Sequence, residues 1–500
     1  MKGFLGLTLL PLLAAGSPVF VDTIHNEAAP IISSTNAKEI PDSYMVVFKK
    51  HVSQKGALQH QAWIDDIHLS STIRKQELRK RGLTLEDAIN YTGLKHTYNI
   101  AGSVMGYAGH FDPEVIEQVR MHPDVEYVER DSEVHTLKKD TSPSLEKNAP
   151  WGLARISHRD SLNFGSFNKY LYSDNGGEGV DAYIIDTGTN VDHVDFEGRA
   201  SWGKTIPAND EDVDGNGHGT HCSGTVAGKK FGVAKKASIY AVKVLKSNGS
   251  GTMSDVVKGV EWAANAHAES ISAAKKGKKK GFKGSVANMS LGGGKSRLLD
   301  LAVNAAVDAG LHFAVAAGND NADSCNYSPA AAENAVTVGA STLSDERAYF
   351  SNFGTCNDIF APGLNILSTW IGSNYATNVI SGTSMASPHI AGLLAYYLSL
   401  QPSSDSAYAV AEITPKKLKA NIISIATEGA LSNVPADTAN LLAWNGGGSS
   451  NYTQIIEDGG YTVDNGLGST TGDYISEKAA QLKAELQKIA AELEALIERS

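Results

Sequence analysis

Three residues that can share one reaction stand far apart in the chain: Asp186, His218 and Ser384. A serine hydroxyl is a weak nucleophile until a base takes its proton. An imidazole can take that proton near neutral pH, and a carboxylate fixes the imidazole tautomer. Asn319 adds a side-chain amide that can donate to a developing oxyanion, beside the backbone N–H of Ser384. Together these residue types predict acyl transfer through a serine nucleophile.

Taken singly, each of these positions has a simpler interpretation. Ser384 stands in SGTSMASPH, where Gly382 and Thr383 can form a turn and Thr383 can cap the following helix. Asp186 and Asn319 are residue types that commonly occupy turns. The chemical hypothesis is stronger for the set, because every member falls at an expected strand or helix end. A helix N-terminus also favours developing negative charge.

The histidine motif GHGTHCSGTVAG leaves a metal site as an alternative. His218 and His221 are spaced i, i+3, and Cys222 follows directly. Against metal, the segment lacks the glutamate of H-E-x-x-H and the paired cysteine spacings of zinc sites. Cys222 is also an alternative nucleophile, but Ser384 has the better context at a helix start.

The elements that must position these residues alternate between strands and helices from Trp151 to about Gly446. Short apolar runs predict strands at GVDAYIID, SIYAVKVL, GSVANMSL, GLHFAVAAG and AVTVGAS, whereas SDVVKGVEWAANAHA and RLLDLAVNAAVDA have helical spacing. This alternation predicts a parallel sheet covered by helices on both faces. In such sheets, sites form at the carboxyl ends of the strands, which is where Asp186 and Asn319 fall.

Residues 43–136 form a separate unit. SYMVVFKK, SVMGYAGHF and VEYVERDSEV read as strands, and QAWIDDIHLSSTIRKQEL and DPEVIEQVRMHP have helical spacing. A small α+β domain is predicted. The polar stretch TLKKDTSPSLEKNAP follows it and is typical of a linker that proteases can reach.

The composition and the N-terminal residues indicate in which compartment the protein is found and which partners it does not bind. The 500 residues carry a formal net charge of −11, which argues against a general nucleic-acid binder. Residues 1–16 have the pattern of a signal peptide, and no later stretch is long enough to predict a membrane span. The chain has three cysteines, so one disulfide and one free thiol are expected in an oxidising compartment. Sequons occur at five asparagines, of which Asn288 and Asn326 are discounted: Asn90, Asn248, Asn288, Asn326 and Asn451.

The end of the chain differs from the rest. Residues 447–472 are rich in Gly, Ser, Asn and Asp and are expected to be flexible. From Ile475 to Leu496, apolar residues recur at alternating intervals of four and three, which predicts a helix with a heptad seam. That helix can dock on its own protein, self-associate or bind a partner helix, and the pattern leaves these alternatives open.

The motifs VDAYIIDTGTNVDHVDF, GHGTHCSGTVAG, SLGGG, AAGND and SGTSMASPHIAG resemble those of subtilisin-like serine proteases, and APWGLARISHR is similar to the proteinase K branch. The resemblance implies an α/β, subtilisin-like three-layer fold with a parallel sheet between helices, preceded by a small α+β inhibitor propeptide domain. It gives Asp186, His218 and Ser384 the triad roles and Asn319 the oxyanion role. The implied segments are a signal peptide at 1–16, a propeptide at 17–137, a peptidase domain at 138–446 and an extension at 447–500.

The resemblance also implies substrate contacts, a disulfide and a metal ligand. An edge strand and two pocket walls would bind an extended peptide; the residues are Gly249, Ser250, Gly251, Ser290, Leu291, Gly292, Ala316, Ala317 and Gly318. Their small, uncharged side chains imply broad endopeptidase activity with large apolar or aromatic P1 residues. Cys325 and Cys356 match a disulfide of some relatives. Asp358 aligns with a structural calcium ligand, with carbonyl groups near Glu333 and Ala335 as co-ligands; no cofactor is expected for catalysis.

Two further segments depart from simple secreted relatives. The Lys-rich insertion at 275–284 is expected to be a solvated loop, open to self-cleavage. The C-terminal extension is similar to that of fungal vacuolar members such as cerevisin. The resemblance therefore implies residence in the vacuole, with secretion as the alternative. Expected partners are protein and peptide substrates and the chain's own propeptide.

Overall fold

A computed structural model describes residues 28–33, 38–80, 91–136, 149–402 and 413–463. The chain divides into two compact units. The first consists of Met1–Ser34 and Glu39–Asp131, and the second of Thr35–Lys38 and Ser132–Ser500.

The first unit is an α+β domain, as the sequence predicts. Its strands are β1 (Ile31–Ile32), β2 (Glu39–Phe48), β3 (Gly93–Ile100), β4 (Val104–His110) and β5 (Val125–Thr136), the last of which runs on past Asp131; its helices are α1 (Gln54–Lys80) and α2 (Pro113–Arg120). The strand order is β5-β2-β4-β3, and β1 pairs in parallel with β5. Alternate residues of β2, such as Val46 and Phe48, enter a core with Ile64 and Val115. Strand β3 was not predicted, because GLKHTYNI is largely polar.

The second unit is built on a ten-stranded sheet. Its order is β20-β18-β19-β15-β14-β12-β10-β6-β8-β7, and the seven strands from β15 to β7 are parallel. The parallel strands are β6 (Val180–Asp186), β7 (Ala200–Thr205), β8 (Ser238–Lys243), β10 (Gly284–Met289), β12 (His312–Ala316), β14 (Val336–Ser341) and β15 (Ile359–Pro362). At the far edge lie β18 (Thr427–Glu428), β19 (Leu441–Leu442) and β20 (Tyr461–Thr462). The predicted parallel sheet is therefore confirmed.

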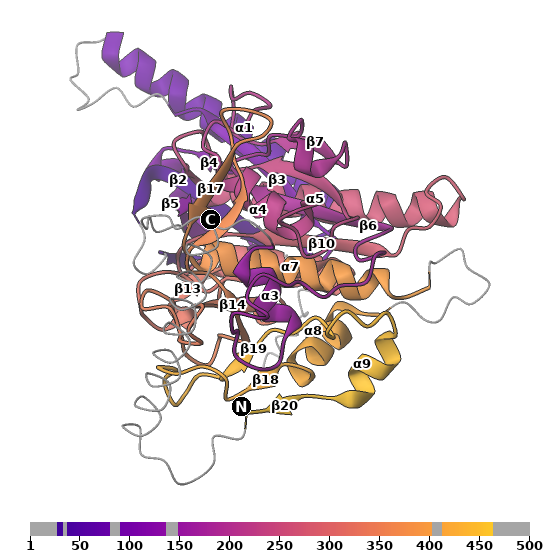
Figure 1. The fold of residues 1–500 in the computed structure, drawn as a ribbon. Helices are drawn as coiled ribbons and strands as arrows, with labels where there is room; N and C mark the ends of the chain where they lie inside the picture. The colour runs from indigo at the N-terminus through magenta and orange to yellow at the C-terminus, as the bar shows by residue number, and fades with distance from the viewer. Residues whose placement is uncertain (1–27, 34–37, 81–90, 137–148, 403–412, 464–500) are drawn as a thin grey trace, which may run out of the picture. The chain divides into compact units, whose positions relative to one another are not determined.

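Helices pack on both faces of this sheet (Figure 1). They are α3 (Trp151–Ser157), α4 (His218–Ala227), α5 (Met253–Lys275), α6 (Arg297–Asp308), α7 (Thr383–Ser399), α8 (Pro415–Ser424) and α9 (Tyr452–Asp458). The side chains of β6 show why helices pack on both faces of the sheet. Ala182 and Ile184 enter the core that contains α4 and α7, whereas Tyr183 faces Trp262 of α5 and Ile185 lies beside Gly259 of α5. A strand buried on both faces reads as one apolar run, as VDAYIID does.

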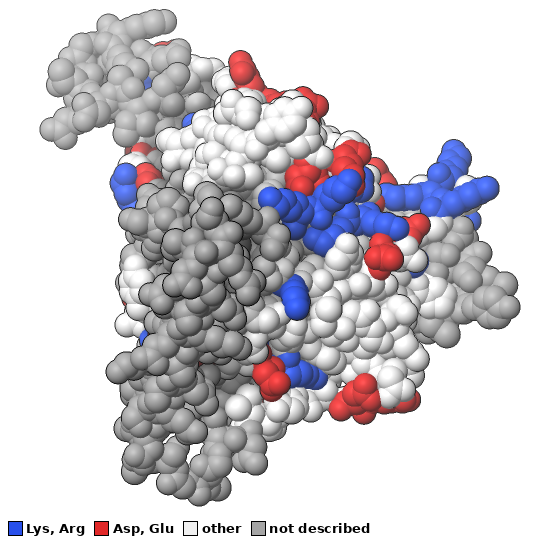
Figure 2. All heavy atoms as spheres, in the orientation of Figure 1, with Lys and Arg blue, Asp and Glu red and all other residues white. Residues whose placement is uncertain are grey.

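The Lys-rich insertion is more ordered than expected. Helix α5 runs through Lys275, and Lys279 then forms an ion pair with Asp181 and a 3.0 Å hydrogen bond to Ser270. Lys283 donates to the carbonyl of Ser399. On the face drawn in Figure 2, basic side chains gather near the end of α5. The predicted solvated loop is confirmed for residues 276–278 and 280, which are exposed, whereas Lys279 and Lys283 are anchored to the fold.

The beginning of the C-terminal extension is also structured. Helix α9 buries Ile455, and β20 pairs in parallel with β18. The Arg159 guanidinium lies 3.6 Å from the centre of the Trp444 ring and 5.9 Å from that of Tyr461. The prediction of flexibility is therefore wrong for Tyr452–Thr462, where distant contacts override a Gly- and Ser-rich composition. The heptad at 475–496 lies outside the described residues.

Candidate active site

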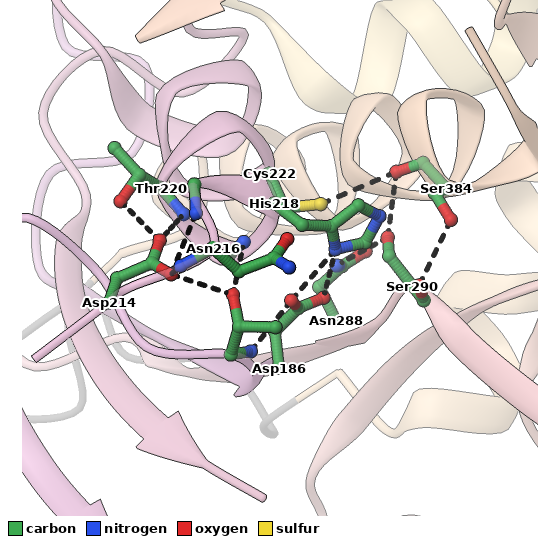
Figure 3. A network of polar contacts seen from close by, with 12 residues as sticks. Asp186, Asp214, Asn216, His218, Thr220, Cys222, Asn288, Ser290 and Ser384 are labelled. Carbon is green, nitrogen blue, oxygen red and sulfur yellow. Dashed lines mark hydrogen bonds and ion pairs between the residues drawn. The ribbon is translucent and has the colours of Figure 1, made fainter. Parts of the chain in front are cut away.

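The four residues expected to share one reaction come from the ends of two strands of the ten-stranded sheet and from the starts of two helices. Asp186 is the last residue of β6, and Asn319 follows the end of β12. His218 is the first residue of α4, and Ser384 is the second residue of α7. Because the parallel strands share one carboxyl edge, side chains distant in sequence meet there. Figure 3 shows the His218 ring between the Asp186 carboxylate and the Ser384–Ser290 pair.

Asp186 and His218 form a buried hydrogen-bonded pair. Nδ1 of His218 lies 2.8 Å from Oδ1 and 3.0 Å from Oδ2 of Asp186, and both side chains are inaccessible to solvent. The carboxylate also accepts from the backbone N–H of Thr187 at 2.7 Å. A carboxylate beside Nδ1 holds the proton there, so Nε2 carries the lone pair. Within the described residues Nε2 of His218 has no hydrogen-bond partner, which leaves it available as a base.

Ser384 makes a reciprocal contact with Ser290 rather than with the imidazole. Its Oγ donates to the carbonyl oxygen of Ser290 at 3.0 Å, and Oγ of Ser290 donates to the carbonyl oxygen of Ser384 at 2.7 Å. The Cys222 thiol also lies 3.5 Å from that carbonyl oxygen. A proton transfer from Ser384 to His218 would therefore require the Ser384 side chain to turn away from Ser290.

Asn319 is held with its amide nitrogen free to donate. Its Oδ1 accepts from the backbone N–H of Thr383 at 2.9 Å and from the Thr383 hydroxyl at 3.0 Å. Oγ1 of Thr383 in turn accepts from the N–H of Gly318 at 3.1 Å. Thr383 is thus the first residue of α7 and orients Asn319, whereas the N-cap is Gly382. The alternative prediction of Thr383 as the cap is wrong.

A fifth residue, Asp214, organises the loop that carries the histidine, and sequence analysis missed it. Its Oδ1 accepts from the Thr187 hydroxyl at 2.9 Å and from the N–H of Gly217 at 2.9 Å. Its Oδ2 accepts from both the N–H and the hydroxyl of Thr220, at 2.9 and 2.6 Å. An Asp just before a Gly-rich turn, as in DGNGHGT, is the signal that could have found it.

Glycine is required directly before the histidine. Gly217 has φ +93°, and a Cβ placed on it would lie 2.6 Å from the Trp370 ring. The left-handed conformation costs glycine little and lets the chain turn sharply into α4. His218 therefore starts a helix at a fixed point beside Asp186.

The alternative roles of the neighbouring His221 and Cys222 are not favoured by their surroundings. Nε2 of His221 is 2.9 Å from the carbonyl oxygen of Ile366, and burial lowers the pKa of this histidine to about 3. Burial raises the pKa of the Cys222 thiol, which keeps it protonated. Ligand atoms of Cys222, Asp186 and His218 do lie within 4.8 Å of one another. However, Asp186 and His218 already bind each other, and a protonated thiol is a poor metal ligand.

The residues expected to bind substrate flank a strand of the chain itself. The end of β5 pairs antiparallel with β9 (Ser250–Thr252), Val134 opposite Gly251, and with β11 (Leu291–Gly294), Thr136 opposite Leu291. Gly249 and Ser290 directly precede these two strands. Ala316, Ala317 and Gly318 are buried at the end of β12. Two backbone edges thus hold an extended segment between them, as they would hold a peptide.

Cys325 and Cys356 form a disulfide, with Cα atoms 5.3 Å apart, and Cys222 is a buried free thiol. Among the sequons, Asn288 is fully buried, with its side chain hydrogen-bonded to Ser290 and Ser387, so it is closed to glycosylation in the folded chain.

The calcium ligands implied by the resemblance do not fit a bound ion. Asp358 and the carbonyl groups of Glu333 and Ala335 do converge, but on the ammonium group of Lys419. A cation at that point would collide with Nζ.

A sheet edge that brings a buried Asp–His pair, a helix-start serine and an oriented amide together defines a hydrolase of the serine type. A model of the Subtilase family matches residues 177–447, and a model of Peptidase inhibitor I9 matches residues 43–137. The chain therefore belongs to the subtilase family and carries an I9 inhibitor domain, as expected of a serine endopeptidase zymogen.

Proteins with similar sequences are also named as proteases. The chain is 76% identical to "Subtilisin-like serine protease Pen c 2" of Penicillium citrinum, over 92% of this chain and 100% of that protein. It is 73% identical to "Alkaline protease 2" of Aspergillus fumigatus, over 93% of each chain. A solved structure of a cold adapted subtilisin-like serine proteinase is 44% identical; it covers 60% of this chain and 99% of its own, with a TM-score of 0.52. In the described part of the chain, helices long and apolar enough to cross a membrane are absent.

Proposed function

We propose that this chain is a self-processing serine endopeptidase with Asp186, His218 and Ser384 as its triad. The observation that carries the proposal is the buried Asp186–His218 pair, whose outer nitrogen is free on the side of Ser384. In the reaction, Ser384 Oγ attacks the peptide carbonyl carbon and gives its proton to Nε2 of His218. The amine leaves with that proton, and water then hydrolyses the acyl-enzyme.

The oxyanion of each tetrahedral intermediate is bound by the amide nitrogen of Asn319 and the backbone N–H of Ser384 in this proposal. The support is the fixed orientation of Asn319, since Thr383 occupies its Oδ1 with two hydrogen bonds. A donor held in place before the reaction loses no energy to reorganisation when charge develops.

We propose that the chain cuts itself between Leu137 and Lys138, at the expected propeptide boundary. The antiparallel register supports a cut close to this bond, because the described strand β5 ends at Thr136, opposite Leu291. The bond itself lies outside the described residues. Leu291 directly follows Ser290, which exchanges hydrogen bonds with Ser384, so the described end of β5 lies close to the proposed nucleophile.

Broad specificity with large apolar or aromatic P1 residues is part of the proposal. It is supported by the absence of charged residues from both expected walls, Ser290–Gly292 and Ala316–Gly318, which apart from Leu291 are small. Peptide-library cleavage followed by mass spectrometry tests this preference. Cleavage confined to sites after Lys and Arg pairs would contradict it.

Residence in the vacuole, with secretion as the alternative, is also proposed, from residues 1–16 and the extension beyond Gly446. Microscopy of a tagged chain with and without residues 464–500 tests whether the extension directs sorting. Equal distribution of the two forms would remove that role.

The central test is intact-mass analysis of wild type and Ser384→Ala, each with and without a serine-directed phosphonate. Wild type should lose residues 1–137 and take up one inhibitor at Ser384. The variant should keep its propeptide and stay unlabelled. If both folded proteins stay whole and unlabelled, the chain is a catalytically silent relative that acts through its inhibitor domain.

A further inference from the structure

Lys419 stands at the point where the resemblance implies a calcium ion. Its Nζ lies 2.8 Å from Oδ2 of Asp358, 2.8 Å from the carbonyl oxygen of Glu333 and 2.6 Å from that of Ala335. The side chains of Lys419 and Asp358 are 19% and 21% exposed. The three oxygens are therefore those of the implied site, but an ammonium group holds them.

The elements around the site fix this arrangement. Lys419 lies on α8, which Thr414 caps through the N–H of Lys417, and the neighbouring residues Leu418 and Ile422 are buried in the main core. This anchoring limits the rotation of α8 about its own axis. The Lys419 side chain therefore starts from a fixed direction.

The oxygens come from two adjacent parallel strands. Ala335 directly precedes β14 and Glu333 lies two residues earlier, whereas Asp358 directly precedes β15, with Val338 opposite Ile359. Asp358 also accepts from the N–H of Thr337 and donates its own N–H to the carbonyl of Thr337. The carboxylate is therefore held in place independently of Lys419.

The number of ligands suits a lysine. An ammonium group has three N–H donors, and three oxygens surround Nζ of Lys419, so every donor is satisfied. Calcium takes six to eight oxygen ligands at about 2.3–2.6 Å and would need several waters in addition to this set. One carboxylate also balances the single charge of the ammonium without excess.

We propose that the Lys419 ammonium is a built-in cation that takes the place of calcium and makes this part of the peptidase domain independent of the metal. The same oxygens form a latent calcium site that opens when the ammonium is removed. A cavity of about 690 Å³, lined in part by Glu333, Lys416 and Lys419, borders the site and gives an ion and its waters access.

The test compares thermal unfolding in EDTA and in millimolar CaCl₂, with calcium binding followed by calorimetry. All variants are made in the full Ser384→Ala chain to limit autolysis, and intact mass before each melt confirms that the chain is whole. The key variant is Lys419→Met, which keeps the alkyl stem and removes the charge. Lys419→Gln serves if Lys419→Met does not fold. The matched control is Lys417→Met, an exposed lysine of the same helix.

In EDTA, Lys419→Met should melt several degrees below the parent chain, because it leaves a largely buried carboxylate without its counter-charge. Calcium should restore part of that loss, and Lys419→Met should bind one more calcium ion than the parent. Adding Asp358→Asn should abolish both gains. Lys417→Met should behave as the parent.

Three results would overturn the inference. In EDTA, Lys419→Met could melt at the same temperature as the parent, which would mean that the ammonium does not stabilise the fold. It could be destabilised yet gain no calcium, which would reduce the site to an ordinary ion pair. Finally, any calcium-dependent rise in the parent's melting temperature could vanish with Asp358→Asn alone, which would mean that the ion displaces Lys419 in the native chain.

Discussion

Asp186 at the end of β6 and Asp358 just before β15 each face a basic side chain. The two pairs differ in whether the basic side chain keeps a nitrogen that has no hydrogen-bond partner. Asp186 binds Nδ1 of His218, and Nε2 remains without a partner in the described residues. Asp358 faces Lys419, whose three donors all have acceptors. A pair with one unfilled position can move a proton, whereas a saturated pair can only hold the structure together. The comparison predicts that breaking the first pair costs activity and breaking the second costs stability.

The largest effect is expected from Asp186→Asn. The amide cannot stabilise an imidazolium and favours the wrong tautomer of His218, so the rate of propeptide cleavage should fall by roughly 10⁴-fold. Intact mass followed over time measures that rate. The melting temperature should change little, and exposed Asp160→Asn is the control. A fall of less than tenfold would mean that Asp186 is not the orienting acid.

The buried Arg155–Asp345 ion pair tests the prediction that breaking a saturated pair costs stability. Arg155 donates through Nε to Asp345 at 2.6 Å and through a terminal nitrogen to the carbonyl of His158 at 2.7 Å, and its side chain is 1% exposed. Arg155→Met should lower the free energy of unfolding by about 3–5 kcal/mol, because the Asp345 charge is left buried and unpaired.

Urea unfolding of the Ser384→Ala chain measures the loss in the Arg155→Met variant, with Lys417→Met as the exposed control. The processing rate of folded Arg155→Met, measured without the Ser384 substitution, should stay at the wild-type value. A slow but stable Arg155→Met protein would contradict the assignment of this pair to structure alone.

The positions of the three proposed triad residues could be predicted from sequence, because each one marks a local boundary. Asp186 ends an apolar run, His218 follows a glycine turn and Ser384 opens a helix. The resemblance then supplied their roles. Local pattern also predicted both domains and most of the parallel strands.

The saturated pairs could not be predicted, since their partners are distant. PKKLKAN reads as a solvated helix face, and only the fold brings Lys419 to Asp358, 61 positions earlier. The same is true of the stacking of Arg159 on Trp444 and Tyr461, which helps to order the start of the extension against its own composition. Asp214 was missed for another reason: the turn signal in DGNGHGT does not show which groups the carboxylate will bind, and the fold gives it five contacts to backbone and hydroxyl groups.

A smaller effect should follow from Asn319→Ala. Losing one oxyanion donor costs about 10²–10³-fold in kcat, with KM little changed, because the contact is made in the transition state. Hydrolysis of a peptide substrate by processed enzyme measures both constants.

Thr383→Val serves as the partner variant. It keeps the donor and removes only the hydroxyl that orients it, so it should lose less than Asn319→Ala. An equal loss in both variants would contradict this order and would mean that the Asn319 amide contributes only when the Thr383 hydroxyl orients it.

The smallest effect concerns a histidine that is buried without a carboxylate. His267 is inaccessible, both of its ring nitrogens lack partners in the described residues, and burial, with a smaller contribution from Lys279, lowers its pKa to about 4. Between pH 4 and 6.5 the unfolded chain binds this proton and the folded chain does not. The imidazole therefore makes stability fall as the pH falls through that window, by about 1.4 kcal/mol per unit.

His267→Leu should lower the pH slope of urea unfolding of the Ser384→Ala chain between pH 6.5 and 4.5 by about 1.4 kcal/mol per unit, whatever its offset at pH 8. The slope that remains comes from other buried histidines with a lowered pKa, such as His221 and His312. Processing by the otherwise wild-type chain at pH 8 should continue in the variant, provided that it folds. An unfilled imidazole nitrogen would then be reactive only where a carboxylate holds the other nitrogen, as Asp186 does for His218. If the slope stays and processing stops, His267 has a role in catalysis, and the free nitrogen rather than the carboxylate pair is the feature that marks the reactive site.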